Sequence, residues 1–100
     1  MIKSFANEET RTFWETGTSA KIPPSNLRSV SKRKLQMVDA ATQLADLKVP
    51  PGNKLHPLED NRAGQHAIWI TDQFRVCFTW KESHAYDVEI IDYHDESRKK

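Results

Sequence analysis

Alternating apolar and polar residues dominate the second half of the chain. Four such runs occupy residues 54–59, 65–71, 74–80 and 86–92, and short polar connections separate them. A period of two residues is typical of strands, and connections of this length favour hairpins. We therefore predict an antiparallel meander of four strands. A shorter alternation at residues 1–5 predicts a brief first strand.

The region between residue 7 and residue 45 carries helical patterns instead. Asn7 is a suitable N-cap and Gly17 a suitable stop for a first helix. Residues 27–45 repeat apolar side chains on one side of a helix, after two prolines and a candidate cap at Ser25. Prolines and a glycine within residues 48–54 then end the helical region.

The second predicted helix has a basic side. Arg28, Lys32 and Arg33 lie opposite its apolar side, where they either face solvent or contact a polyanion. Lys34 falls within the apolar side, so we expect its stem to pack and its ammonium to reach solvent at an edge.

These elements predict an α+β domain with two helices packed on one face of a small, mainly antiparallel sheet. With 100 residues, the chain has the length of one domain. We assign residues 1–94 to that domain and expect residues 95–100 to form a charged, disordered tail.

Strand alternation also assigns side chains to the two faces of the sheet. One face of the third run is entirely apolar and should meet the helices; it carries Phe74, Val76, Phe78 and Trp80. Arg75 and Cys77 project from the other face. Two interpretations of Arg75 stay open at this point: a functional cation, or a surface ion pair with Glu89 or Asp87.

Composition narrows the function classes. The chain is 37% hydrophobic and 29% charged, with no apolar stretch near the roughly 20 residues that span a bilayer. No signal-peptide core follows Met1, and the single cysteine, Cys77, fits a reducing compartment. We expect a cytoplasmic protein without a membrane partner. A net charge of +1 gives little bulk attraction for nucleic acid.

The side chains that could take part in catalysis are acids, bases and cations. The four histidines, His56, His66, His84 and His94, have no metal-site spacing, and three glycines leave no phosphate-binding loop, so we expect no metal and no cofactor. A metal-free set of His, Arg, Tyr and carboxylate side chains suits cleavage of RNA through its own 2′-hydroxyl. A histidine at a strand end is also compatible with a purely structural role.

Several segments, taken in their order along the chain, resemble those of one known family. They are "MIKSF", the Leu-His-Pro-Leu run at residues 55–58, the "RVCF" strand and the closing Asp92-Tyr93-His94. In this order they are similar to the HigB family of bacterial toxins, within the RelE-like superfamily, from residue 1 to residue 94. The resemblance implies a RelE-like fold and the toxin half of a type II toxin–antitoxin pair.

The resemblance also implies a reaction and partners. Such toxins enter the ribosomal A site and cut the translated mRNA without a metal ion. A HigA-like helix-turn-helix antitoxin neutralises the toxin and represses the operon, so operator DNA is reached only through the antitoxin.

The family pattern places the active site on five residues. His94 would be the main acid or base, Arg75 the phosphate clamp and Tyr93 a stacking or orienting group. Asp92 would order the chain end, and His56 would be a second proton carrier or positioner. Because strand alternation separates Tyr93 from its neighbours, we expect the strand to end near Asp92 and the chain to curl towards Arg75.

Two features depart from the family pattern. Glu59 stands where some relatives carry Lys, and Arg62 is the nearest basic substitute. We count Arg62 with Arg28, Lys32 and Arg33 as candidate RNA contacts, and the basic end of the tail as a candidate rRNA contact.

Glu59 keeps a second function open, in which a catalytically weak homologue acts mainly as an antitoxin-binding co-repressor of its operon. A general ribonuclease acting on naked RNA is a third alternative, disfavoured by the low net charge.

Overall fold

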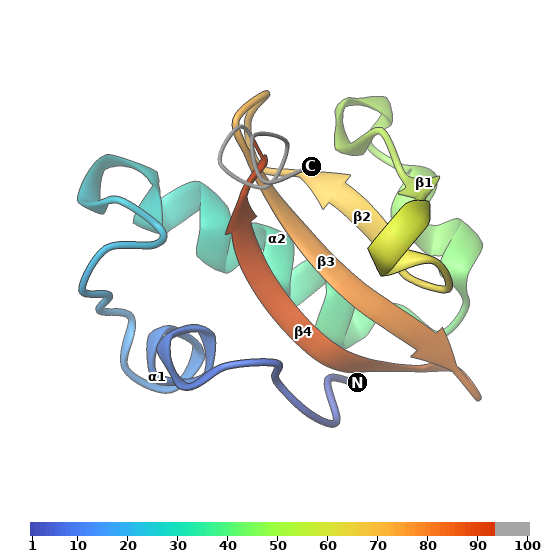
Figure 1. Ribbon diagram of the computed structural model, residues 1–100, viewed down its shortest axis with the longest axis horizontal. Helices are drawn as coiled ribbons and strands as arrows, with labels where there is room; N and C mark the ends of the chain where they lie inside the picture. Colours follow the sequence, from blue (N-terminus) through green and yellow to red (C-terminus); the bar gives the residue numbers. More distant parts are fainter. Residues whose placement is uncertain (94–100) are drawn as a thin grey trace.

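The computed structural model describes residues 1–93, with two helices followed by a four-stranded sheet (Figure 1). The elements are α1 Glu8–Thr16, α2 Arg28–Ala40, β1 His56–Pro57, β2 His66–Trp69, β3 Phe74–Lys81 and β4 His84–Asp92. Four short 3-10 turns accompany them at Ser25–Leu27, Leu44–Lys48, Pro51–Asn53 and Asp60–Arg62. The strands follow the order β1-β2-β3-β4, each antiparallel to the next. The predicted α+β class and meander are confirmed.

The N-terminal segment follows the free edge of β4 but is less regular than predicted. Ile2 and Phe5 form isolated parallel bridges with Ala85 and Val88. Between them β4 carries a bulge at Asp87, whose φ of 52° interrupts the extended backbone. The Ser4 hydroxyl accepts a hydrogen bond from the backbone N–H of that bulged residue, so the edge is covered without a continuous ladder.

The first helix has the predicted boundaries, whereas the second does not. The Asn7 side chain accepts from the Thr10 N–H at 2.8 Å, and Gly17 is left-handed with a φ of 80°. Ser25 makes no capping bond; it opens a 3-10 turn that precedes α2. The helix also ends at Ala40 rather than at residue 45.

A carboxylate explains this early end. Asp46 accepts from the backbone N–H groups of Thr42 and Gln43 and from the Thr42 hydroxyl, at 3.0–3.2 Å. These local bonds hold residues 41–43 out of the helical conformation, because a side chain now satisfies the N–H groups that helix continuation would use. They also lower the pKa of Asp46.

The main core lies between the helices and one face of the sheet. Its fully buried members include Phe13 from α1, Leu35 and Val38 from α2, and Val76 and Phe78 from β3. In Figure 1, α2 crosses behind the sheet and α1 lies beside β4. The predicted apolar face of β3 therefore meets the helices, and the face with Arg75 points away from them.

Lys34 does not reach solvent as expected. Its side chain is buried, and its ammonium donates to Asn53 Oδ1 at 2.5 Å. Asn53, itself fully buried, donates from Nδ2 to the Leu47 carbonyl at 3.2 Å. This polar connection ties α2 to the loop that leads into β1, and burial lowers the pKa of Lys34, with Arg33 adding to the effect.

Asn53→Ala should therefore lower the free energy of unfolding by about 2 kcal/mol, since it leaves a buried ammonium without its acceptor. Lys34→Met should cost less, because it removes the charge together with its desolvation penalty. Urea denaturation of both variants checks the order, and a larger loss for Lys34→Met would contradict it.

The same lysine predicts a pH dependence. Its folded pKa lies below the ordinary 10.5, so between the two values the unfolded chain binds more protons. The contribution of Lys34 to stability therefore rises with pH through that window. Denaturation at increasing alkaline pH should show this rise in the wild type relative to Lys34→Met, and parallel curves would refute it.

A candidate phosphate-binding cleft on the open face of the sheet

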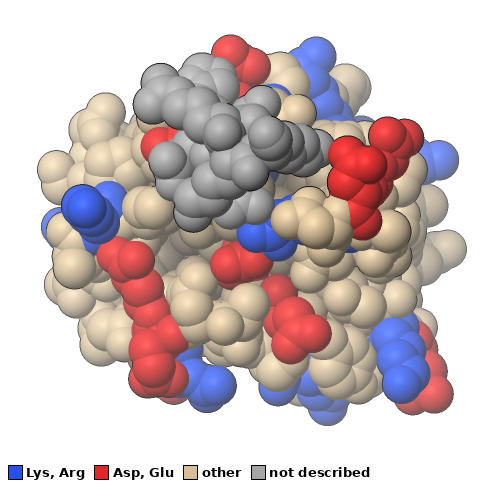
Figure 2. Space-filling view, in the orientation of Figure 1, with Lys and Arg blue, Asp and Glu red and all other residues tan. Residues whose placement is uncertain are grey.

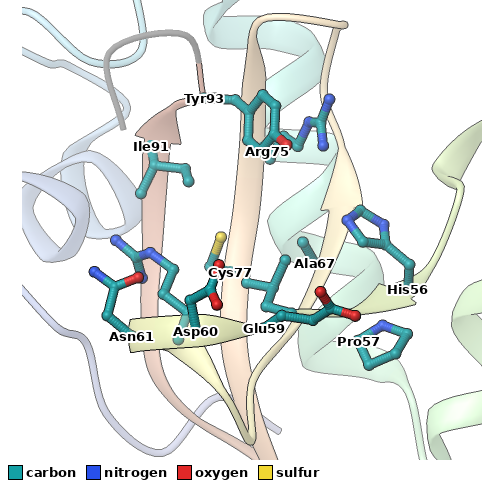
Figure 3. A pocket seen from close by; sticks show the side chains of 12 residues that line it. His56, Pro57, Glu59, Asp60, Asn61, Ala67, Arg75, Cys77, Ile91 and Tyr93 are labelled. Carbon is teal, nitrogen blue, oxygen red and sulfur yellow. The ribbon is translucent and has the colours of Figure 1, made fainter. Parts of the chain in front are cut away.

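A cleft of about 320 Å³ opens on the sheet face that points away from the helices (Figure 3). Its floor is apolar and consists of Ala67, Cys77 and Ile91, which are buried together. Residues 57–62 form one wall, and His56, Arg75 and Tyr93 complete the lining. Cys77 thus serves as a small apolar floor residue. The cleft gathers three of the five predicted active-site residues.

Arg75 is the central cation of this cleft. Its side chain is only 8% exposed, and its guanidinium carbon lies 3.7 Å from the Tyr93 ring centroid and 4.6 Å from that of Trp69. Nη2 donates to the Asp72 carbonyl at 3.2 Å and lies 3.8 Å from the carboxylate of the same residue. Among the described residues, Arg75 Nε is buried without a hydrogen-bond partner. A phosphate oxygen would satisfy this donor.

The ion pair considered as an alternative for Arg75 does not form. Glu89 binds Arg62 instead, at 2.7 Å, and Asp87 occupies the bulge of β4. The carboxylate beside Arg75 comes from Asp72, in the connection between β2 and β3.

The end of β4 separates Asp92 from Tyr93. Asp92 pairs with Phe74 on the helix-facing side and accepts from Gln73 Nε2 at 3.1 Å. The strand ends there, and the Tyr93 N–H donates to the Gln73 carbonyl at 2.6 Å while its ring turns to Arg75. The predicted end of β4 near Asp92 is confirmed. Tyr93 needs no curl to reach Arg75, because alternation places it on the face of Ile91, the residue that pairs with Arg75. His94 lies outside the described residues.

His56 has a defined hydrogen-bond role. Its Nδ1 lies 2.7 Å from the Lys54 carbonyl oxygen, and since a carbonyl only accepts, Nδ1 carries the hydrogen. In the neutral ring Nε2 then holds the lone pair and is able to accept a proton. The backbone of Lys54 therefore selects the form of His56 that suits a base.

His66, next to His56 along the β1–β2 hairpin, is of a different kind. It stacks on Phe78 at a centroid distance of 6.5 Å, on the helix-facing side of the sheet. Burial lowers the pKa of His66, and the nearby His56 lowers it further. Because a lowered pKa makes protonation less favourable, His66 is a poor source of positive charge beside the cleft.

The loop wall contains both departures from the family pattern. Glu59 lines the cleft, as its sequence position suggested. Arg62 also lines it, but its Nη1 is held by Glu89 at 2.7 Å and by Gln65 Oε1 at 3.0 Å. Glu89 is held in turn by Asn7 Nδ2 at 3.2 Å, so this network anchors the loop to β4 and to the start of α1.

The basic residues of α2 are distant from this wall, since the helix packs on the other face of the sheet. Arg28 donates to Ser19, and Lys32 donates to the Trp14 carbonyl in the last turn of α1 while lying over the Trp14 ring. Arg33 is exposed. The structure therefore brings neither Arg28 nor Lys32 to the cleft, and gives both of them packing roles.

Two cleft neighbours were missed in the sequence. Trp69 stands directly opposite Arg75 in the β2–β3 register, and Lys54 lies over the Trp69 ring at 5.0 Å. Strand alternation places Trp69 on the same face as Ala67, and this pattern could have identified Trp69 from the sequence. Lys54 gave no such signal, because it precedes β1 in a left-handed turn with a φ of 49°.

Residues 1–93 offer neither a metal site nor a membrane-spanning helix. In that span no group of three or more His, Cys, Asp or Glu side chains is arranged to hold a metal ion. None of the helices described is long and apolar enough to cross a membrane.

Comparison with known proteins points to one family. Residues 3–94 match the HigB-like toxin family, described as RelE-like toxins of type II toxin–antitoxin systems. Toxin HigB-1 of Vibrio cholerae is 33% identical over 85% of this chain and 90% of its own length. Endoribonuclease HigB of Proteus vulgaris is 32% identical over 94% of this chain and its full length. An uncharacterised Haemophilus influenzae protein is 32% identical over 71% of this chain and 70% of its own length.

The Arg62–Glu89 pair should contribute to stability because both side chains are largely shielded, at 20% and 17% exposure. A double-mutant cycle with alanine at both positions should give a coupling energy of about 1 kcal/mol. The exposed Arg11–Glu8 pair is the matched control and should give about 0.3 kcal/mol. Equal coupling in the two cycles would show that the cleft wall is not anchored by this pair.

Proposed function

The chain belongs to the HigB-like family of RelE-like toxins from type II toxin–antitoxin systems, and from this membership we propose that it is a ribosome-dependent mRNA endonuclease. It cuts translated mRNA in the ribosomal A site, needs no metal ion, and thereby inhibits growth. The relative named Endoribonuclease HigB supports the reaction class.

One observation carries the proposal: a buried arginine whose Nε points to no protein acceptor among the described residues. The two rings and the Asp72 carbonyl hold the Arg75 guanidinium in one orientation before any ligand arrives. A phosphodiester in the cleft would accept from that donor, and the guanidinium would stabilise the charge that builds up on the phosphorus-bound oxygens.

The proton transfers fit the two histidines. His56 Nε2 removes the proton from the ribose 2′-hydroxyl, and the 2′-oxygen attacks phosphorus to form a 2′,3′-cyclic phosphate. The bond to the 5′-oxygen breaks, and His94, the main acid in this scheme, protonates that leaving group. The Tyr93 ring packs on Arg75, and because the residue is 38% exposed it can also stack on an RNA base. Asp92 keeps the end of β4 in place through Gln73.

The charge distribution supports dependence on the ribosome. On the face shown in Figure 2, the Lys and Arg side chains of the described residues are interspersed with Asp and Glu. Arg62 is paired with Glu89, and Glu59 adds a carboxylate to the cleft lining. Such a surface has weak unaided attraction for RNA, so the ribosome would position the substrate.

The partners follow from the same family. The proposed antitoxin is a HigA-like helix-turn-helix protein that neutralises the toxin in the cytoplasm. It also binds operator DNA, so the toxin is associated with that DNA only through the antitoxin. The co-repressor alternative rests on Glu59 alone, and the match to an endoribonuclease does not favour it.

Primer extension on a reporter mRNA in translating ribosomes tests the enzyme. The wild type should give discrete A-site cuts, and Arg75→Ala should reduce them about 100-fold, through loss of a preorganised charge. His56→Ala and His94→Ala should abolish the cuts, because each removes one proton transfer.

Arg11→Ala is the matched control, since it removes an exposed arginine of α1 outside the cleft. It should cut like the wild type. A folded wild type that gives no cuts would favour the co-repressor, and cuts on the same mRNA without ribosomes would favour a general ribonuclease.

The α2 surface makes a separate prediction. If exposed Arg33 contacts an rRNA phosphate, Arg33→Gln should reduce the slope of log affinity against log salt by about 1 in ribosome-binding measurements. Lys81→Gln, an exposed cation at the end of β3, is the control. An unchanged slope in Arg33→Gln would mean that this side chain merely faces solvent.

A further inference from the structure

Trp69 lies beside the cleft and contacts two cations, Arg75 and Lys54. Its ring centroid lies 4.6 Å from the Arg75 guanidinium carbon and 5.0 Å from the Lys54 ammonium nitrogen. Both distances are within the range in which a cation is attracted to an aromatic ring, and tryptophan is the strongest such partner. Trp69 therefore contacts both segments that carry the candidate chemistry.

On one side, Trp69 belongs to the frame that surrounds the guanidinium. It ends β2 directly opposite Arg75, and the connection that follows is held by hydrogen bonds from Ile70 and Thr71 to the Phe74 carbonyl. The same connection presents the Asp72 carbonyl to Arg75 Nη2. The ring and the carbonyl thus limit the guanidinium from two directions.

On the other side, Trp69 meets the residue that orients His56. Lys54 has a left-handed backbone, and its N–H donates to the Pro51 carbonyl at 3.0 Å. Its own carbonyl binds His56 Nδ1 at 2.7 Å, while its ammonium lies over Trp69. The ring consequently connects the segment of the proposed base to the segment of the phosphate clamp.

We propose that Trp69 is a positioning residue, which keeps the Arg75 guanidinium oriented towards the scissile phosphate and couples its position to that of Lys54 and His56. This role rests on the proposed endonuclease function. It requires the aromatic ring, whereas simple apolar packing would be served equally well by leucine, and this difference makes the role testable.

Three variants separate the two roles. Trp69→Leu removes the ring, Trp69→Phe keeps a weaker one, and Trp80→Leu makes the same change on β3 at the helix-facing side. In ribosome-dependent cleavage, Trp69→Leu should lower kcat about tenfold with little change in KM, the size expected for one cation–π contact that orients a catalytic group. Trp69→Phe should recover most of the loss, and Trp80→Leu should leave kcat within about twofold of the wild type.

A second measurement does not depend on catalysis. In the isolated, isotope-labelled protein, the Arg75 Nε–H should exchange slowly with solvent because it is buried. Trp69→Leu should speed this exchange, and Trp80→Leu should not. If the wild type cuts no mRNA, the proposed function fails while this measurement still decides whether Trp69 holds Arg75.

Chemical rescue provides the strictest test. Methylguanidinium should partly restore cleavage to Arg75→Ala, because the slot between Trp69 and Tyr93 remains. It should fail to rescue the double variant Arg75→Ala/Trp69→Leu. Equal rescue in both backgrounds, or a Trp69→Leu variant with wild-type kcat and slow Arg75 exchange, would overturn the positioning role.

Discussion

The burial of one guanidinium is the constraint on which the site depends. Arg75 is the second residue of β3 and has little exposure, so its charge needs compensation from the protein. The Tyr93 ring after β4 supplies part of it, and the Trp69 ring and the Asp72 carbonyl supply the rest from the end of β2 and the connection to β3. Burial excludes water from a cation that is already oriented, and both conditions strengthen its attraction for a phosphate.

The two faces of the sheet differ, and this difference allows a charged side chain to be buried beside the cleft. One face packs in the core, and the other carries the cleft. Phe78 and Val76 on one face meet Phe13, Leu35 and Val38, so the helices complete a closed core there. The other face has only a small apolar floor, and residues 57–62 form a wall above it. The cleft can therefore hold polar groups and a carboxylate, Glu59, without disturbing the packing that stabilises the fold.

Several cations that looked available in the sequence are committed to the fold. Arg62 anchors the cleft wall through Glu89, Lys32 binds the end of α1, and Lys34 is buried against Asn53. Their side chains stabilise contacts between elements, so their charge adds less to RNA attraction than a count of basic residues suggests. This distribution is what the proposed dependence on the ribosome for substrate presentation would require.

Local patterns in the sequence determined the element types, the meander and the face of β3 on which Arg75 lies, because alternation and helical spacing depend only on near neighbours. They also placed the end of β4 near Asp92. Tertiary structure alone decided which side chains meet. Glu89 pairs with Arg62 and not with Arg75, and Trp69 contacts both Lys54 and Arg75. A period of two assigns a face but names no partner, since register and loop paths bring together residues that are distant in the chain.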